Sequence, residues 1–327
     1  MMAVQRYALE HEATWNAFVA GAKNATFLFR RDYMGYHSDR FSDHSLMLWR
    51  DDEPAAVLPA NLTSDGMLVS HGGLTYGGLL VPRMATLVDV LESFYFALRH
   101  LHEQGVAKVL YKMLPAFYCR LPAGEAEYAL FLLGARLCRR DSALVVRCAE
   151  RLPPRKGRKS EISKARRFDI RVGQDAEFRP FWEQVLVPRL AGRFGVKPVH
   201  SLEEITLLAG RFPDNIKQFS AWCGEEIVAG VTIYETEVVA HAQYIAVSEH
   251  GQQMGALDHL IGWLLDERYK AKQCFDFGTC NEAEGRALNH GLLDWKEAFG
   301  GRCYCHDFYE IDSVSFAALE SVLRPRL

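Results

Sequence analysis

The second half of the chain has the clearer pattern of hydrophobic and polar positions. Ser201 followed by Glu204 forms a capping box, which predicts a helix that ends before Pro213. Three runs rich in apolar and β-branched residues come next, separated by polar or glycine-containing turns. These runs predict strands over residues 216–223, 227–236 and 238–248.

The period changes after the third of these runs. Five leucine and isoleucine residues recur at helical spacing and predict a helix over 255–272. A short apolar run predicts a strand over 274–278, and a second helical pattern covers 282–299. Residues 302–311 predict a closing strand.

The first half of the chain repeats this order of elements. Apolar runs predict strands over 45–50, 54–62 and 67–72. A strongly amphipathic run over 87–104 predicts a helix that ends at Gly105. A strand, a helix and a last strand are predicted over 106–114, 124–135 and 142–149.

This shared order of elements predicts the fold class. We expect an α/β protein built from two tandem domains, each with a mixed sheet, although the two halves have little sequence similarity. The expected boundaries are an N-terminal domain over 1–150, a basic linker helix over 151–168 and a C-terminal domain over 169–327. A chain of 327 residues also has the length of two domains of roughly 150 residues each.

Composition and charge narrow the classes of function. The formal net charge of −3 gives no overall attraction to nucleic acid or to an anionic membrane. The eight cysteines form no C-x-x-C pair, so we expect reduced thiols and no metal site. No signal-peptide pattern begins the chain, and no apolar run approaches the roughly 20 residues that span a bilayer. The expected location is the cytoplasm.

One segment departs from this neutral balance. Between Arg147 and Arg167 the chain has nine lysine or arginine residues against two glutamates. One interpretation is a solvated linker helix. The other is a patch that binds phosphate groups, either of a nucleotide-bearing substrate or of tRNA.

The strongest candidate site is the junction after the third predicted strand of the second half. There a strand runs into a loop with Gln252 and Gly255 and then into a helix. Backbone N–H groups at a helix N-terminus are unpaired and lie at the positive end of the helix dipole, so such a junction can bind a diphosphate. The loop resembles the acyl-CoA-binding signature of the GNAT acetyltransferases, Q-x-x-G-x-G/A, but Leu257 stands where that family has a final glycine or alanine.

This resemblance implies where an acyl-CoA donor would bind. It places the donor between the third and fourth strands of the C-terminal sheet, against the turn at Gln252 and Gly255. The residues that it implies for donor binding are Val247, Ser248, Gln252, Gln253, Met254, Gly255, Ala256 and Asn281.

A second motif closes the last predicted helix. Gly291 and Leu292 are followed by Trp295 and Lys296, and then by Phe299, Gly300 and Gly301. The run resembles the motif G-L-x-x-F-K-x-x-F-G-G, with Trp295 in place of the first phenylalanine. That motif ends the second of two GNAT-like domains in the Fem-type peptidoglycan aminoacyltransferases and their relatives from polysaccharide loci. The resemblance covers most of the chain and implies two tandem GNAT-like domains, the N-terminal one degenerate and on the acceptor side.

The family mechanism implies direct transfer of an acyl group to an amine, with a base for the amine proton and a donor for the oxyanion. His241, Gln243 and Tyr244 lie on the strand beside the expected donor, and simple alternation places Tyr244 on the opposite face from the other two. His241 is the candidate base because histidine titrates nearest to neutrality. Asp276, on the next strand, is a second candidate base or a group that orients the acceptor. The structural alternatives are a core histidine and a carboxylate that caps a turn.

Candidates for acceptor binding lie in two places. Lys296 is a candidate ligand for a phosphate or carboxylate, with a solvated helix lysine as the alternative. The other place is a polar cluster near the N-terminus, for which an ordinary polar surface is the alternative. This cluster contains Arg30, Tyr33, His37 and Arg40.

Three functions remain open. The first is acyl-CoA-dependent acylation of an amine, small or carrier-linked, in a cell-envelope or polysaccharide precursor; this acceptor class follows from the resemblance alone. The second is aminoacyl transfer from a charged tRNA, as in the Fem enzymes, which the basic segment favours and the lack of a coiled-coil heptad run disfavours. The third is a non-catalytic GNAT-like binding module, which the departure at Leu257 favours. No G-x-S-x-G, H-E-x-x-H or Walker motif indicates another chemistry.

Overall fold

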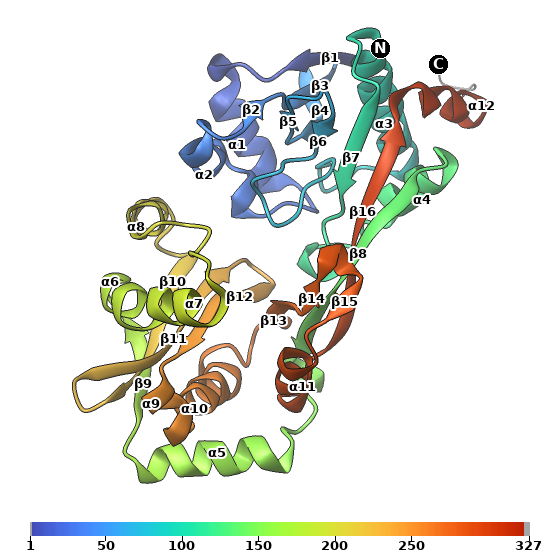
Figure 1. The fold of residues 1–327 in the computed structure, drawn as a ribbon. Coiled ribbons are helices and arrows are strands. Elements are labelled where there is room, and N and C mark those ends of the chain that lie inside the picture. Colours follow the sequence, from blue (N-terminus) through green and yellow to red (C-terminus); the bar gives the residue numbers. More distant parts are fainter. Residues whose placement is uncertain (1, 324–327) are drawn as a thin grey trace. The chain divides into compact units, whose positions relative to one another are not determined.

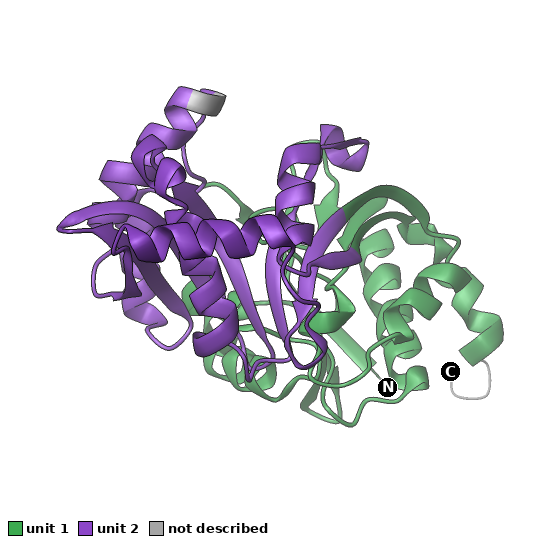
Figure 2. Cartoon of the chain, turned by 90° about the horizontal axis from the view of Figure 1, so that it is seen from below, with its two compact units in different colours: residues 1–141, 305–327 green, residues 142–304 purple. Residues whose placement is uncertain are grey.

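The computed structural model describes residues 2–323, apart from the side chains of residues 193 and 194. Its contacts divide the chain into two compact units (Figure 2). Unit 1 contains Met1–Asp141 and Cys305–Leu327, and unit 2 contains Ser142–Tyr304. The chain therefore returns to unit 1 after Tyr304, whereas the expected boundaries assign these residues to the C-terminal domain.

Unit 1 is a mixed α/β unit with two sheets. Its strands are β1 (Met2–Arg6), β2 (Ser42–Asp43), β3 (Leu46–Arg50), β4 (Glu53–Leu58), β5 (Asn61–Leu62), β6 (Leu68–Val69), β7 (Lys108–Lys112), the first half of β8 (Arg136–Arg147) and most of β16 (Arg302–Asp312). Its helices are α1 (Glu12–Gly21), α2 (Arg31–Met34), α3 (Leu87–Glu103), α4 (Glu125–Leu132) and α12 (Glu320–Leu323). Strands β1, β3 and β4 form one sheet, and β2, β5, β6, β7 and β16 are consecutive neighbours in the other.

Helix α3 organises the core of unit 1. Thr86 and Asp89 cap its N-terminus reciprocally, and Gly105 follows its end with a φ of +79°. Its apolar face is buried against the strands, and Leu98 lies in the same cluster as Leu319 and Leu323 from the end of the chain. The predicted helix over 87–104 is confirmed.

Unit 2 is a second mixed α/β unit (Figure 1). Its strands are the end of β8 (Arg136–Arg147), β9 (Arg171–Asp175), β10 (Ile216–Cys223), β11 (Glu226–Glu235), β12 (Val239–Val247), β13 (Cys274–Thr279), β14 (Asn281–Glu282) and β15 (Ala287–Leu288). Its helices are α5 (Lys156–Arg167), α6 (Arg179–Phe181), α7 (Val187–Phe194), α8 (Leu202–Arg211), α9 (Glu249–Met254), α10 (Ala256–Trp263) and α11 (His290–Ala298), with π-helical turns at Trp182–Leu186 and Leu264–Arg268. The main sheet has the order β8-β13-β12-β11-β10-β9.

Short-range signals place most elements of unit 2 correctly. The capping box is confirmed, since Ser201 Oγ accepts from the Glu204 amide at 3.1 Å and Glu204 Oε2 accepts from the Ser201 amide at 2.8 Å. The three predicted strands after it are β10, β11 and β12. Helix α10 packs its apolar side on this sheet, where Leu260 and Ile261 are fully buried.

Two helix predictions are wrong in their extent. The helix predicted over 255–272 is shorter than expected, because α10 spans Ala256–Trp263, a π-helical turn continues it over Leu264–Arg268, and residues 269–272 are not helical. Residues 282–288 are not helical as predicted. They form the hairpin of β14 and β15, whose turn contains Ala283 and Glu284 at positive φ. Helix α11 begins only after Asn289, whose side chain accepts from the Leu292 amide at 3.0 Å.

Strand β12 contains a β-bulge. Ala242 is opposite Ile233 and Tyr244 is opposite Thr232, so Gln243 is an extra residue in the ladder with β11. His241 pairs with Tyr234, which lies two residues from Thr232 on β11. Directly opposed residues share a face, so His241 and Tyr244 lie on the same face of the sheet. The prediction that Tyr244 points away from His241 is therefore wrong, because the bulge breaks the alternation.

Strands β12 and β13 are parallel and pair over only three positions. The ladder runs from Val239–Cys274 to His241–Asp276, and no later pair joins these strands among the described residues. On its other edge β13 pairs with β8 from Cys274 to Thr279, with a shift of register after Asp276. The second part of β12 therefore has a free edge toward β13.

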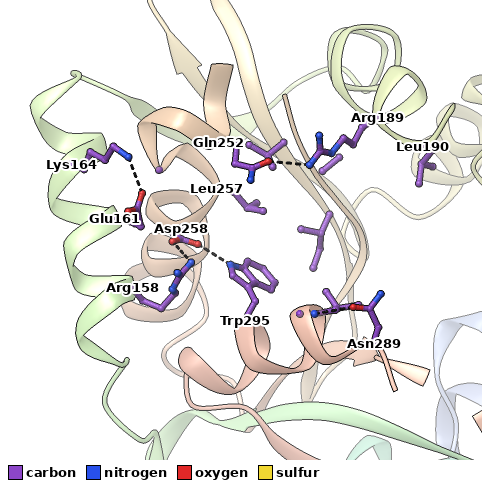
Figure 3. Close-up of a pocket in the computed structure, with 16 residues that line it drawn as sticks. Arg158, Glu161, Lys164, Arg189, Leu190, Gln252, Leu257, Asp258, Asn289 and Trp295 are labelled. Carbon is purple, nitrogen blue, oxygen red and sulfur yellow. Dashed lines mark hydrogen bonds and ion pairs between the residues drawn. The ribbon is translucent and has the colours of Figure 1, made fainter. Parts of the chain in front are cut away.

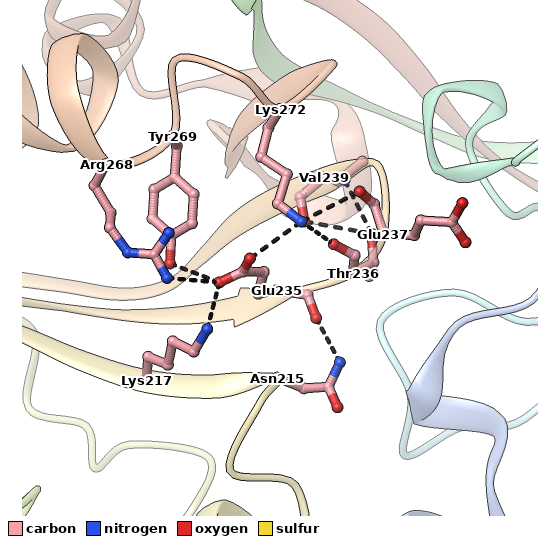
Figure 4. Close-up of polar contacts among 9 residues, drawn as sticks. All are labelled: Asn215, Lys217, Glu235, Thr236, Glu237, Val239, Arg268, Tyr269 and Lys272. Atoms are coloured by element: carbon pink, nitrogen blue, oxygen red, sulfur yellow. Dashed lines mark hydrogen bonds and ion pairs between the residues drawn. The ribbon is translucent and has the colours of Figure 1, made fainter.

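The paired end of β12 is fixed by an ionic network around Glu235 (Figure 4). Its carboxylate accepts from Lys217 at 2.8 Å and from Tyr269 at 3.1 Å, and it lies 3.1 Å from Lys272. Burial raises the pKa of Glu235, but the hydrogen bonds from Lys217 and Lys272 outweigh burial and hold this pKa below its usual range. Lys272 also donates to the carbonyl of Thr236 at 2.6 Å, which ties the β11–β12 turn to the segment before β13.

Candidate functional site

A cleft with a volume of about 670 Å³ opens in unit 2 beside the free edge of β12 (Figure 3). Its walls come from helices α5 and α7, the end of β12, the α9–α10 junction and helix α11. The residues that line it are Arg158, Glu161, Lys164, Arg189, Leu190, Ile245, Ala246, Val247, Gln252, Gly255, Leu257, Asp258, Asn289, Gly291, Leu292 and Trp295.

The parting of the two strands explains why a cleft forms here. Ile245, Ala246 and Val247 line the cleft and lie past His241, the last residue of β12 that pairs with β13. An unpaired strand edge offers backbone N–H and C=O groups to a ligand. The bulge at Gln243 lies between the paired part and the free part of the strand, where it bends β12.

The α9–α10 junction forms one wall and is closely packed. Ser248 caps α9 by accepting from the Gly251 amide at 3.0 Å. The Gly255 amide bonds to the Gln252 carbonyl at 3.3 Å. A Cβ atom at Gly255 would lie only 2.5 Å from the carbonyl oxygen of Glu161, so glycine is required here by both space and φ. Helix α5 thus packs directly on the turn that resembles the GNAT signature.

Helix α5 also brings charge to the cleft. Arg158 forms an ion pair with Asp258 at 2.5 Å, and the Trp295 indole N–H donates to the same carboxylate at 2.8 Å. Burial raises the pKa of Asp258, while Trp295 and Arg158 act in the opposite direction. Lys164 lies 3.3 Å from Glu161. These contacts join α5, α10 and α11 around one end of the cleft.

A third cation enters the cleft from α7. Arg189 donates from its guanidinium to Gln252 Oε1 at 3.0 Å, and Figure 3 shows this contact reaching from α7 to the α9 segment. Among the described residues no carboxylate pairs with Arg189. The cleft therefore combines apolar walls with three cations and two carboxylates.

His241 and Asp276 meet at the point where β12 and β13 separate. His241 Nδ1 lies 2.8 Å from Asp276 Oδ2, and both side chains are largely buried. The other Asp276 oxygen accepts from the Gly278 amide at 2.7 Å. A carboxylate that holds Nδ1–H fixes the tautomer of the imidazole and leaves its lone pair on Nε2. The structure thus brings together two of the predicted catalytic residues.

The other two predicted catalytic residues have different surroundings. The Tyr244 hydroxyl lies 2.6 Å from His200 Nδ1 and accepts from the His200 amide at 3.0 Å, which anchors the segment before α8 to β12. Gln243 is the bulge residue, and its Oε1 is buried without a hydrogen-bond partner among the described residues.

The predicted donor-binding residues divide into two groups. Val247, Gln252 and Gly255 line the cleft. The remaining ones have structural contacts or point elsewhere: Met254 and Ala256 are buried in the core, Ser248 caps α9, Gln253 is exposed on α9, and Asn281 accepts from Ser142.

Lys296 is buried and does not line the cleft. Its ammonium donates to the carbonyls of Gly278 and Thr279 at 3.0 and 2.6 Å, at the end of β13. Burial lowers the pKa of Lys296 to about 8. The ammonium therefore holds the strand end that also carries Asp276, and its role in substrate binding stays a prediction.

The remaining predicted acceptor residues lie in unit 1. Tyr33 and His37 are buried, Tyr33 edge-on to Phe27 at 5.5 Å between ring centroids. Arg30 and Arg40 reach the surface, beside Asp32 and Tyr36 respectively. Their part in acceptor binding also stays a prediction.

The cleft residues that sequence reasoning missed include Arg189, Asp258 and Trp295. Arg189 and Asp258 are single charged residues on amphipathic helices, and Trp295 was considered only as part of a motif. For Asp258 a usable signal existed: a carboxylate three residues after Gly255 lies in the first turn of α10, on the side that α5 covers. Arg189 had no local signal.

No protein-family model matches the sequence, and no curated protein is significantly similar to it. Solved structures do match: FemX superposes with a TM-score of 0.66 at 10% identity, over 98% of this chain and 99% of that chain. The L-PGS structure from Bacillus licheniformis matches with a TM-score of 0.58 at 15% identity, over 97% and 98% of the two chains.

A tandem GNAT protein from the clavulanic acid biosynthesis pathway gives a TM-score of 0.52 at 10% identity, over 96% of this chain and 99% of that one. The protein thus has the α/β fold of the tandem GNAT proteins, and within that fold it has the Fem-like arrangement. The predicted fold class is confirmed. Between residues 2 and 323, no helix combines the length and apolarity needed to cross a membrane.

Proposed function

We propose that this protein is an N-acyltransferase that moves an acyl group from a CoA thioester to an amine by direct transfer. The observation that carries this proposal is the parting of β12 and β13 directly after the His241–Asp276 pair, beside a cleft of about 670 Å³. The site offers an unpaired strand edge for an extended ligand, apolar walls, and cations for a phosphate-bearing group.

The proposed chemistry begins with His241. It takes a proton from the acceptor ammonium through Nε2, while Asp276 holds Nδ1–H and stabilises the imidazolium. The neutral amine attacks the thioester carbonyl carbon, the C–N bond forms and the C–S bond breaks. CoA leaves as a thiolate, which receives the second proton of the attacking nitrogen, and the first proton passes from His241 to solvent.

The acceptor class is a further part of the proposal. An amine of a cell-envelope or polysaccharide precursor, small or carrier-linked, follows from the resemblance of the segment from Gly291 to Gly301 and from the Fem-like fold. The proposed place of action is the cytoplasm.

A thermal-shift titration tests the donor. Acetyl-CoA and longer acyl-CoAs stabilise the protein by mass action if the cleft binds them. Gly255→Asp adds a carboxylate to the cleft wall and should abolish this stabilisation, whereas Gly224→Asp, at another positive-φ turn outside the cleft, should keep it. If acyl-CoA raises the melting temperature of both variants equally, the cleft is not the donor site.

Aminoacyl transfer from a charged tRNA is the second candidate. The exposed face of α5 supports it, because Lys156, Lys159, Arg166 and Arg167 are all exposed there. Salt-sensitive retention of aminoacyl-tRNA, without any shift by acyl-CoA, would favour this candidate. If neither ligand binds, the third possibility of a non-catalytic module is favoured.

A further inference from the structure

Arg158, Lys164 and Arg189 line the cleft, but they differ in how they are paired. Arg158 is paired with Asp258, and Lys164 lies beside Glu161. Arg189 contacts only the neutral amide of Gln252, through a single hydrogen bond from one guanidinium nitrogen among the described contacts. A guanidinium has five N–H donors, so most of the binding capacity of Arg189 remains for a ligand.

The direction of Arg189 follows from the helix that carries it. A π-helical turn at Trp182–Leu186 precedes α7, and such a turn contains one extra residue. One extra residue rotates all later positions by about 100° around the helix axis. Trp182 and Leu186 remain in the core, while Arg189 and Leu190 reach the cleft.

The α9–α10 junction is closely packed against helix α5 and lies beside a carboxylate. The Gly255 amide is bonded to the Gln252 carbonyl, and the Glu161 carbonyl packs against the Gly255 Cα. The Glu161 carboxylate would lie 3.1 Å from a Cβ at Gly255, which places negative charge at this turn. A side-chain cation beside this turn would offset that negative charge for an anionic ligand.

We propose that Arg189 is the anion-binding residue of the cleft, that Gln252 is its resting partner, and that its ligand is the phosphate-bearing part of the donor. This inference rests on the proposed function only for the identity of the donor. When a phosphate group enters, Arg189 exchanges the neutral Gln252 oxygen for charged oxygens, an exchange that favours the bound state because charge-assisted hydrogen bonds are stronger.

The test measures binding of three probes by isothermal titration calorimetry: CoA, pantetheine and inorganic pyrophosphate. Arg189→Ala should weaken CoA binding by about 10- to 100-fold and leave pantetheine binding unchanged. Arg189→Lys should recover part of the loss, because it keeps the charge without the fork. Gln252→Glu should also weaken CoA binding, because the new carboxylate would pair with Arg189 and repel phosphate.

Arg179→Ala is the matched control, since this exposed arginine pairs with Glu183 and does not line the cleft. It should bind CoA like the wild type. If wild-type protein binds CoA and Arg189→Ala binds it equally well, the inference is overturned while the proposed function stands. If wild-type protein binds pyrophosphate through Arg189 but not CoA, the donor assignment fails and the anion site stands. Binding of neither probe overturns both.

Discussion

Replacement of Gly255 by alanine tests the packing of α5 on the α9–α10 junction. Two costs add at this position. A residue with a Cβ in the left-handed region loses about 1–2 kcal/mol, and Gly255 has a φ of +74°. The new Cβ would also lie 2.5 Å from the Glu161 carbonyl, so the backbone of α5 must shift, which costs about 1–3 kcal/mol more. We expect the free energy of unfolding to fall by about 2–5 kcal/mol.

Gly195 provides a matched control within the same unit. It ends α7 in the left-handed region with a φ of +64°, but a Cβ there would meet no atom within 4 Å. Gly195→Ala should therefore show only the conformational cost, about 1 kcal/mol, reduced by the lower entropy of the unfolded chain. The difference between the two variants isolates the contact with α5.

Urea unfolding followed by tryptophan fluorescence is the assay. Four of the six tryptophans lie in unit 2, so the signal reports mainly on the unit that contains both glycines. The midpoint and slope give the free energy of unfolding for each variant. Equal losses for Gly255→Ala and Gly195→Ala would refute the claim that α5 packs closely on the junction.

Three other variants test the site and its supports. His241→Ala should reduce turnover by at least about 100-fold while CoA affinity in calorimetry stays unchanged, and wild-type turnover would reassign the base. Asp258→Asn should lower the free energy of unfolding by about 1–3 kcal/mol, because the two oxygens of Asp258 accept from Arg158 and Trp295 and the amide keeps only one oxygen. The surface variant Glu183→Gln should change this free energy by less than about 0.5 kcal/mol. Burial lowers the pKa of Lys296 to about 8 in the folded protein. Between about pH 8 and 10 this lysine therefore binds more protons in the unfolded chain than in the folded one, and the free energy of unfolding rises with pH by up to about 1.4 kcal/mol per pH unit. Urea titrations at these pH values should show a smaller rise in Lys296→Met, and an identical rise would contradict the assignment.

Local signals in the sequence were sufficient for most of the fold. The capping box at Ser201 and the amphipathic run over 87–104, together with alternating apolar runs, indicate elements whose causes lie within a few residues. The extent of helices was less predictable. The expected loop around Gln252 is part of helix α9, and the helix expected over 255–272 changes to a π-helical turn after Trp263. The turn at Ala283 and Glu284 has no glycine at its left-handed positions, so no strong signal marked it.

The candidate site was predictable only in part. Strand order and motif resemblance singled out the Gln252–Gly255 loop, His241 and Asp276, but the hydrogen bond between His241 and Asp276 was not predicted. The face of Tyr244 was not predictable, because a bulge at Gln243 arises from pairing with β11 and not from the sequence of β12 alone. Arg189 reaches the cleft through a π-helical turn, which no short sequence pattern marks.

The return of the chain to unit 1 affects the order of synthesis. Residues 305–323 leave the ribosome after all of unit 2, yet Ile311, Leu319 and Leu323 belong to the core around α3. Unit 2 is contiguous, so all of its residues are available before those of unit 1 are complete. Nascent domains generally fold as soon as their segments emerge, with the N-terminal one first. In this protein unit 2 can therefore finish folding before unit 1. Until residues 305–323 emerge, α3 lacks part of the apolar surface that covers it.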